Sequence, residues 1–168
     1  MSKRIAIIDD DHVIQESLQE TLGDAGYTVF IASDGVSGLE LISREKPDLV
    51  VADILLPRLH GIALCEKLKA SSDFQHIPII LMTGVYKDVN LRMYVHKGLA
   101  ADFIEKPFRE KELLAKIENL LGKAPEKVEA QPPARQATAS ERSREGRPDR
   151  SVDSALDDLV NWAHNKKK

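Results

Sequence analysis

The sequence has 168 residues, of which 42% are hydrophobic and 30% charged, and its formal net charge is -3. This size allows one domain with a sizeable core plus an appendage, and no apolar run approaches the roughly 20 residues that cross a bilayer. The single cysteine, Cys65, excludes an internal disulfide, and the acidic excess of residues 1–122 argues against a nucleic-acid surface. The basic start is followed by an apolar stretch that is too short for a signal peptide, so we expect a cytoplasmic protein. From the charge and the lack of a long apolar run, we expect no binding to nucleic acid or membranes.

Residues 1–122 alternate between short apolar runs and stretches with helical spacing. Strands are expected, in chain order, at 5–8, 27–32, 49–53, 78–83 and 101–105. Helices are expected at 13–22, 36–43, 61–70, 89–97 and 113–121, the first ended by Gly23 to Gly26 and the last by Gly122. This alternation predicts an α/β fold in which a five-stranded parallel sheet is covered by helices on both faces. The functional edge of such a sheet lies at the carboxyl ends of its strands.

Side chains with a shared chemistry follow these strand ends. Asp9, Asp10 and Asp11 come after the first strand, and Asp53 ends the third. Clustered carboxylates repel one another unless a cation compensates, and Mg²⁺ (or Mn²⁺) suits a site with few carboxylates that also binds phosphate oxygens. At the ends of the fourth and fifth strands, a threonine hydroxyl and a lysine ammonium are suited to bind a phosphoryl group on a carboxylate; they belong to Thr83 and Lys106. The pattern predicts phosphorylation of an aspartate.

Four motifs resemble those of the receiver domain of bacterial response regulators, over residues 1–122. They are Ile7-Ile8-Asp9-Asp10-Asp11, Asp53-Ile54-Leu55-Leu56-Pro57 with Gly61, Thr83-Gly84, and Lys106-Pro107-Phe108. The resemblance implies a CheY-like, flavodoxin-like fold with strand order 2-1-3-4-5 and a cis bond before Pro107. It implies a phosphorelay function in a two-component system, in which a histidine kinase or phosphotransfer protein donates the phosphoryl group. The signal would pass on by protein–protein interaction.

The resemblance also assigns roles to residues. Asp53 would be the phosphoacceptor that becomes 4-aspartylphosphate, and catalysis would be limited to this self-phosphorylation and its slow reversal. The metal would be bound by Asp10, Asp53 and the backbone carbonyl of Leu55, with Asp9 acting through water. Thr83 and Lys106 would bind the phosphoryl oxygens. Thr83 and Phe103 would form the conformational switch.

Two apolar residues depart from a pattern that matters for phosphoryl lifetime. Leu55 and Val85 each lie two residues past an active-site residue, where the family positions the water that hydrolyses the acyl phosphate. Apolar side chains cannot orient water, so we expect slow dephosphorylation. The departures at His60, in place of the usual acid, and at Gly84, in place of alanine, are expected to be tolerated.

An alternative is a phosphatase similar to the haloacid dehalogenases, with Asp9 as nucleophile and Asp11 as acid/base. That family also needs a later acidic pair at a strand end, and the only later pair, Asp157-Asp158, falls beyond the linker. The alternative leaves Asp53 without a role.

The composition changes after Gly122. Residues 123–150 carry four prolines and no aromatic residue, which predicts a flexible linker. Residues 151–168 place their apolar side chains at helical spacing and end in three lysines, which predicts a short amphipathic helix. Because so short a helix is marginal alone in water, we expect it to bind its own receiver domain or a protein partner.

Overall fold

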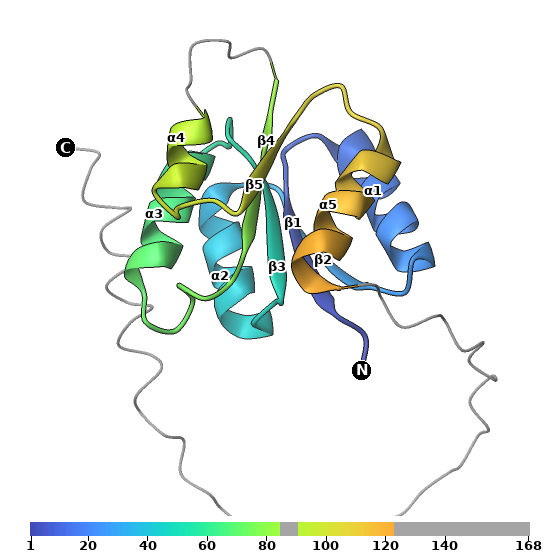
Figure 1. The fold of residues 1–168 in the computed structure, drawn as a ribbon, viewed down its shortest axis with the longest axis horizontal. Coiled ribbons are helices and arrows are strands. Elements are labelled where there is room, and N and C mark those ends of the chain that lie inside the picture. Colours follow the sequence, from blue (N-terminus) through green and yellow to red (C-terminus); the bar gives the residue numbers. More distant parts are fainter. Residues whose placement is uncertain (85–90, 123–168) are drawn as a thin grey trace, which may run out of the picture. The chain divides into compact units, whose positions relative to one another are not determined.

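The computed structural model describes residues 1–84 and 91–122, in which five strands alternate with five helices (Figure 1). The strands are β1 (Arg4–Ile8), β2 (Thr28–Ala32), β3 (Leu49–Asp53), β4 (Ile79–Thr83) and β5 (Asp102–Glu105). The helices are α1 (His12–Asp24), α2 (Gly35–Glu45), α3 (Gly61–Ala70), α4 (Leu91–His96) and α5 (Glu110–Leu121). All strand pairs are parallel and the sheet order is β2-β1-β3-β4-β5, so the predicted fold is confirmed. Val85, the linker and the predicted C-terminal helix lie outside the described residues.

Helices cover both faces of the sheet. Figure 1 shows α1 and α5 on one face and α2, α3 and α4 on the other. Every residue of β3 and β4 is buried, which is why their sequences are continuous apolar runs rather than alternating ones. The core on the α1 and α5 face includes Ile5, Ile7, Leu18, Leu22, Leu49, Val51, Ile80, Met82, Leu113 and Ile117.

The register of the sheet brings the strand ends to one edge. Ile8 pairs with Ala52, the residue before Asp53, so the loop after β1 begins beside the end of β3. Asp53 pairs with Met82, and Thr83 pairs with Glu105. Because parallel strands point the same way, the residues that follow β1 and β5 meet the ends of β3 and β4 at this edge.

Two aspartates cap the helices that leave this edge. The Asp11 side chain accepts a hydrogen bond of 2.9 Å from the backbone N–H of Val13 at the start of α1. The Asp34 side chain accepts bonds of 2.9 Å from the N–H groups of Val36 and Ser37 at the start of α2. Such caps satisfy N–H groups that have no partner within the helix. The helices therefore begin where the sequence predicts them to begin.

Helix ends also follow the sequence. Helix α1 ends at Asp24, within the predicted Gly23 to Gly26 stop, and Gly26 takes a positive φ of 91° in the turn that follows. Helix α5 ends at Leu121 and is followed by Gly122, which has φ 80°. Within residues 1–84 and 91–122, none of the helices is both long and apolar enough for a membrane span.

Candidate functional site

Three carboxylates meet at the carboxyl edge of the sheet. Oxygen atoms of Asp9, Asp10 and Asp53 all lie within 4.8 Å of one another. Asp9 is fully buried and Asp53 is 7% exposed, whereas Asp10 is exposed to solvent. The predicted acidic cluster therefore forms, with two acids enclosed and one at the surface.

Lys106 joins two of these acids. Its Nζ lies 2.7 Å from Oδ2 of Asp9 and 2.5 Å from Oδ2 of Asp53. Burial alone would lower the pKa of Lys106, but its hydrogen bonds to the two carboxylates raise the pKa above the usual value. Burial raises the pKa of Asp9, with Lys106 acting in the opposite direction. The lysine is thus held in its charged form beside a carboxylate whose charge is costly to bury.

The backbone around Lys106 fixes its place. Its N–H donates a 2.6 Å hydrogen bond to the carbonyl of Thr83, which ties the residue after β5 to the end of β4. The Lys106-Pro107 peptide bond is cis, as the resemblance implies. The side chain therefore starts from a defined position at the strand ends.

The hydroxyl of Thr83 lacks a hydrogen-bond partner within the described part of the chain. The residue is 2% exposed, and its Oγ1 is buried. A buried polar atom without a partner costs free energy, so such atoms often have a functional explanation. This hydroxyl is available to bind an oxygen of a ligand at the strand ends.

The loop after Asp53 holds the carboxylate from the other side. The N–H of Leu55 donates a 3.0 Å hydrogen bond to Oδ1 of Asp53, so both carboxylate oxygens are oriented. Gly61 lies against this loop: a Cβ there would come within 2.1 Å of the Asp53 carbonyl oxygen. Its N–H donates a 2.8 Å bond to the carbonyl of Ile54. The glycine of the motif is therefore required by close approach of two backbones.

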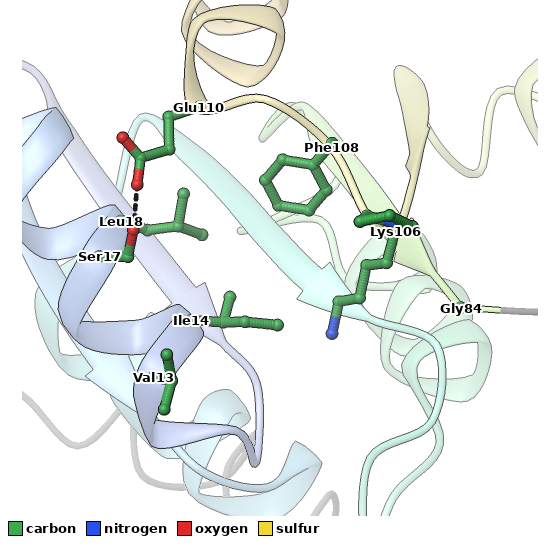
Figure 2. Close-up of a pocket in the computed structure, with 9 residues that line it drawn as sticks. Val13, Ile14, Ser17, Leu18, Gly84, Lys106, Phe108 and Glu110 are labelled. Atoms are coloured by element: carbon green, nitrogen blue, oxygen red, sulfur yellow. Dashed lines mark hydrogen bonds between the residues drawn. The ribbon is translucent and has the colours of Figure 1, made fainter.

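An apolar pocket of about 400 Å³ adjoins Lys106 (Figure 2). It lies between α1 and the loop that leads from β5 into α5. At its rim Glu110 accepts hydrogen bonds from the hydroxyls of Ser17 and Thr21, which link α5 to α1. The walls include Val13, Ile14, Leu18, Gly84, Lys106, Pro107 and Phe108.

The donor set of the acidic cluster suits a hard divalent cation. All three groups are carboxylates, and one ammonium leaves their combined negative charge incompletely neutralised. Oxygen ligands of this kind, few in number and partly open to water, are what Mg²⁺ takes in proteins. The residues present therefore fit the predicted ion.

A comparison with known protein families agrees with the resemblance of the four sequence motifs. The model of the response regulator receiver domain matches residues 5–118. The chain belongs to this family. Receiver domains are the phosphoacceptors of two-component signalling, and this chain shares their function class and their fold.

Curated relatives extend beyond this receiver domain. The chain is 40% identical over 121 residues to the response regulator MprA of Mycobacterium ulcerans (strain Agy99). This alignment covers 72% of this chain and 51% of that protein. It is 40% identical over 118 residues to MprA of Mycobacterium leprae (strain TN), covering 70% and 50%. The chain thus spans about half the length of the curated relatives it matches.

Solved structures of receiver domains share the fold. One, from a signal transduction histidine kinase of Syntrophus aciditrophicus, has a TM-score of 0.66 and 28% identity and covers 82% of this chain and all of that one (100%). Another, from a sensor histidine kinase of Pseudomonas aeruginosa, has a TM-score of 0.65 and 24% identity, covers 73% and 99%, and holds a magnesium ion in its active site cleft.

The phosphatase alternative is not supported. The family match assigns the chain to receiver domains, and the side chain of Asp11 is engaged in capping α1.

Phe103 lies in β5, paired with Leu81, and is partly buried. Sequence reasoning missed Gln15, which is buried next to Asp9: it lies three and seven residues before Leu18 and Leu22, on the buried face of α1, and a polar residue on that face was the signal.

Proposed function

We propose that Asp53 is the residue phosphorylated in this receiver domain. The observation that carries the proposal is the bridge from Lys106 to Asp53 and Asp9. Asp53 and Asp9 each have the Lys106 cation on one oxygen and a backbone N–H on the other, but Asp53 is the less buried of the two and ends the strand that pairs with β4, which carries Thr83. The Thr83 hydroxyl at the end of the neighbouring strand, which has no partner among the described residues, adds a second group for phosphoryl oxygens.

In the proposed reaction a carboxylate oxygen of Asp53 attacks phosphorus. The new bond joins this oxygen to phosphorus, the bond from phosphorus to the imidazole nitrogen of a phosphohistidine breaks, and the electron pair leaves on that nitrogen. The donor is a histidine kinase or a phosphotransfer protein. Lys106 would move from the Asp53 oxygen to the incoming phosphoryl oxygens, where its charge stabilises the transition state.

Mg²⁺ would be held by Asp10, Asp53 and the carbonyl of Leu55, with Asp9 acting through a water molecule. It would neutralise charge between the carboxylates and the phosphoryl oxygens. Asp9 would keep Lys106 oriented through their 2.7 Å contact.

The change after phosphorylation is proposed to run from Thr83 to Phe103. Once its hydroxyl binds a phosphoryl oxygen, Thr83 would shift toward the acceptor. Phe103 lies on the adjacent strand β5 and is only partly buried, so it has room to change its position. The surface around β5 would then bind a different partner.

Slow loss of the phosphoryl group is proposed from Leu55. Its side chain is 46% exposed, next to an acceptor that its own N–H contacts. An apolar group there offers no hydrogen bond to an attacking water. Leu55→Asn should shorten the phosphoryl lifetime in a chase of the labelled protein, and an unchanged lifetime would contradict the proposal. Val85, its predicted partner, lies outside the described residues.

The output is proposed to be binding of a protein, by the receiver surface or by the predicted helix at residues 151–168. The catalytic role of the chain itself would stop at self-phosphorylation and its reversal. A free, buried thiol at Cys65 is compatible with the cytoplasm, which is the proposed location. The acidic balance of residues 1–122 favours a protein partner over a nucleic acid.

Incubation with acetyl phosphate and Mg²⁺, followed by peptide mapping, tests the proposal. We expect label on the peptide containing Asp53 and none in Asp53→Asn. Label that remains in this variant, or that maps to Asp9, would overturn the assignment.

A further inference from the structure

Gln15 is a buried amide beneath the acidic cluster. The buried polar residues in the described part of the chain are Asp9, Gln15, Ser43, Asp53 and Thr83. Three of them belong to the site described above. Gln15 lies in the first turns of α1, is 5% exposed, and has no role in the proposed function.

Its amide group contacts the loop that carries the acids. Nε2 donates to the backbone carbonyl of Asp9 at 2.5 Å and to Oγ of Ser33 at 3.1 Å, and it lies 3.4 Å from the carbonyl of Ala32. Oε1 lies 3.0 Å from Nδ1 of His12. Because carbonyl oxygens only accept hydrogen bonds, the NH₂ group has to face Asp9 and Ala32, which fixes the orientation of the amide.

These contacts complete the restraint on Asp9. Its N–H donates to the carbonyl of Ala32 at 3.1 Å, so β2 holds one side of the residue and Gln15 holds the other. The side chain of Asp9 is held by the N–H of Asp11 at 2.9 Å and by Lys106. The Asp9 carbonyl belongs to the peptide unit that leads into Asp10. The direction of this peptide therefore determines where the exposed carboxylate of Asp10 begins.

We propose that Gln15 is a positioning residue for the cation site, since its amide holds the peptide between Asp9 and Asp10 so that both carboxylates face Asp53. The inference rests on the proposed function of these acids. Gln15 touches neither cation nor phosphoryl group in this scheme. Outer-shell groups that orient metal ligands affect metal affinity strongly, although they never contact the metal.

Titration calorimetry of the full chain with Mg²⁺ tests the role. Gln15→Met keeps the side-chain length but removes both hydrogen-bonding groups, and we expect its Mg²⁺ Kd to rise about tenfold. The rate of phosphorylation by acetyl phosphate should fall at limiting Mg²⁺ and recover at saturating Mg²⁺. A purely structural role would not produce this recovery together with a raised Kd.

Two control variants separate positioning from stability. Ser33→Ala removes one contact of Gln15 but keeps the bond to Asp9, so its Kd should match that of the unmodified chain. Ile79→Val shortens a fully buried side chain at the opposite end of β4 from the site. It should lower the thermal midpoint without changing the Kd.

A folded Gln15→Met chain with unchanged Mg²⁺ affinity would overturn the inference. If this variant does not fold, Gln15→Leu serves instead, because it is apolar and uncharged and has no donor for the Asp9 carbonyl, and the same rise in Kd is expected. The two failures can be told apart. If the unmodified chain binds Mg²⁺ and is labelled on Asp53, and the Gln15 variants have the same Kd, only the role of Gln15 is contradicted. If the unmodified chain neither binds Mg²⁺ nor is labelled on Asp53, the proposed function is contradicted.

Discussion

Lys106 and Asp53 are joined by a 2.5 Å ion pair that crosses the end of β4, the strand between β3 and β5 in the sheet. The same ammonium reaches Asp9 after β1 at 2.7 Å. One cation thus connects the carboxyl ends of three strands, because Asp53 is the last residue of β3, Asp9 follows β1 and Lys106 itself follows β5. The first prediction concerns the loss of this cation.

Lys106→Met should slow phosphorylation by acetyl phosphate about a hundredfold, because a preorganised cation aimed at the phosphoryl oxygens is lost. Mg²⁺ binding should persist or tighten, since the variant removes a competing positive charge. Lys116→Met is the matched control: it removes the same charge from a surface pair, 2.7 Å from Asp102. Equal rates in the two variants would contradict the role of Lys106.

Thr83→Val should leave the free energy of unfolding unchanged or raise it by about 1 kcal/mol, because the hydroxyl it removes is buried and has no partner among residues 1–84 and 91–122. The same variant should lose the NMR shift changes that beryllofluoride causes around β5. Thr83→Ser keeps the hydroxyl and should retain those changes. A large loss of stability in Thr83→Val, measured by urea unfolding, would show that the hydroxyl is already bonded in the resting protein.

Gly61→Ala should destabilise the chain by about 1–3 kcal/mol, because the new Cβ would overlap the Asp53 carbonyl. Gly84→Ala provides the comparison, since no atom of the described residues lies within 4 Å of a Cβ at that position. Urea unfolding of both variants measures the difference. Equal stabilities would contradict the close approach at Gly61.

Asp34→Ala should cost about 1 kcal/mol at neutral pH through loss of the cap on α2. Although burial acts in the other direction, hydrogen bonds from Ser37 and the charge of Arg58 lower the pKa of Asp34 below its usual value of 3.8. The stabilisation is therefore complete above pH 3.8 and is lost as the pH falls through the lowered pKa. The gap between Asp34→Ala and the unmodified chain should close in acid, whereas Asp34→Asn, which keeps a cap, should show little pH dependence. A gap that stays constant into acid would contradict the titration of Asp34.

The sheet and its acidic edge could be predicted from the sequence because local signals agree with the fold. The apolar runs of β3 and β4 are short and continuous, as expected for strands buried on both faces, and Asp34 precedes its helix where a cap is expected. Parallel strands place Asp53, Thr83 and Lys106 at the same edge of the sheet, so their proximity could be predicted before any side-chain contact was known.

Other features depend on packing between distant segments. Gln15 lies on the buried face of α1 with Leu18 and Leu22, but the partners of its amide come from the ends of β1 and β2, so the helix alone could not show what the amide binds. The pocket beside Lys106 forms because the loop before α5 packs on α1. Glu110 accepts hydrogen bonds there from Ser17 and Thr21, which are distant in the sequence, so no local pattern indicates the pocket. The missing partner of the Thr83 hydroxyl likewise becomes visible only when all neighbouring groups are in place.

A crystal structure of the chain with Mg²⁺ and beryllofluoride tests the central claim most directly. We predict beryllofluoride bonded to a carboxylate oxygen of Asp53, with Lys106 Nζ and Thr83 Oγ1 at its fluorine atoms and the cation between Asp10 and Asp53. Beryllofluoride on Asp9, or a Thr83 hydroxyl that stays without a partner in the adduct, would contradict the account.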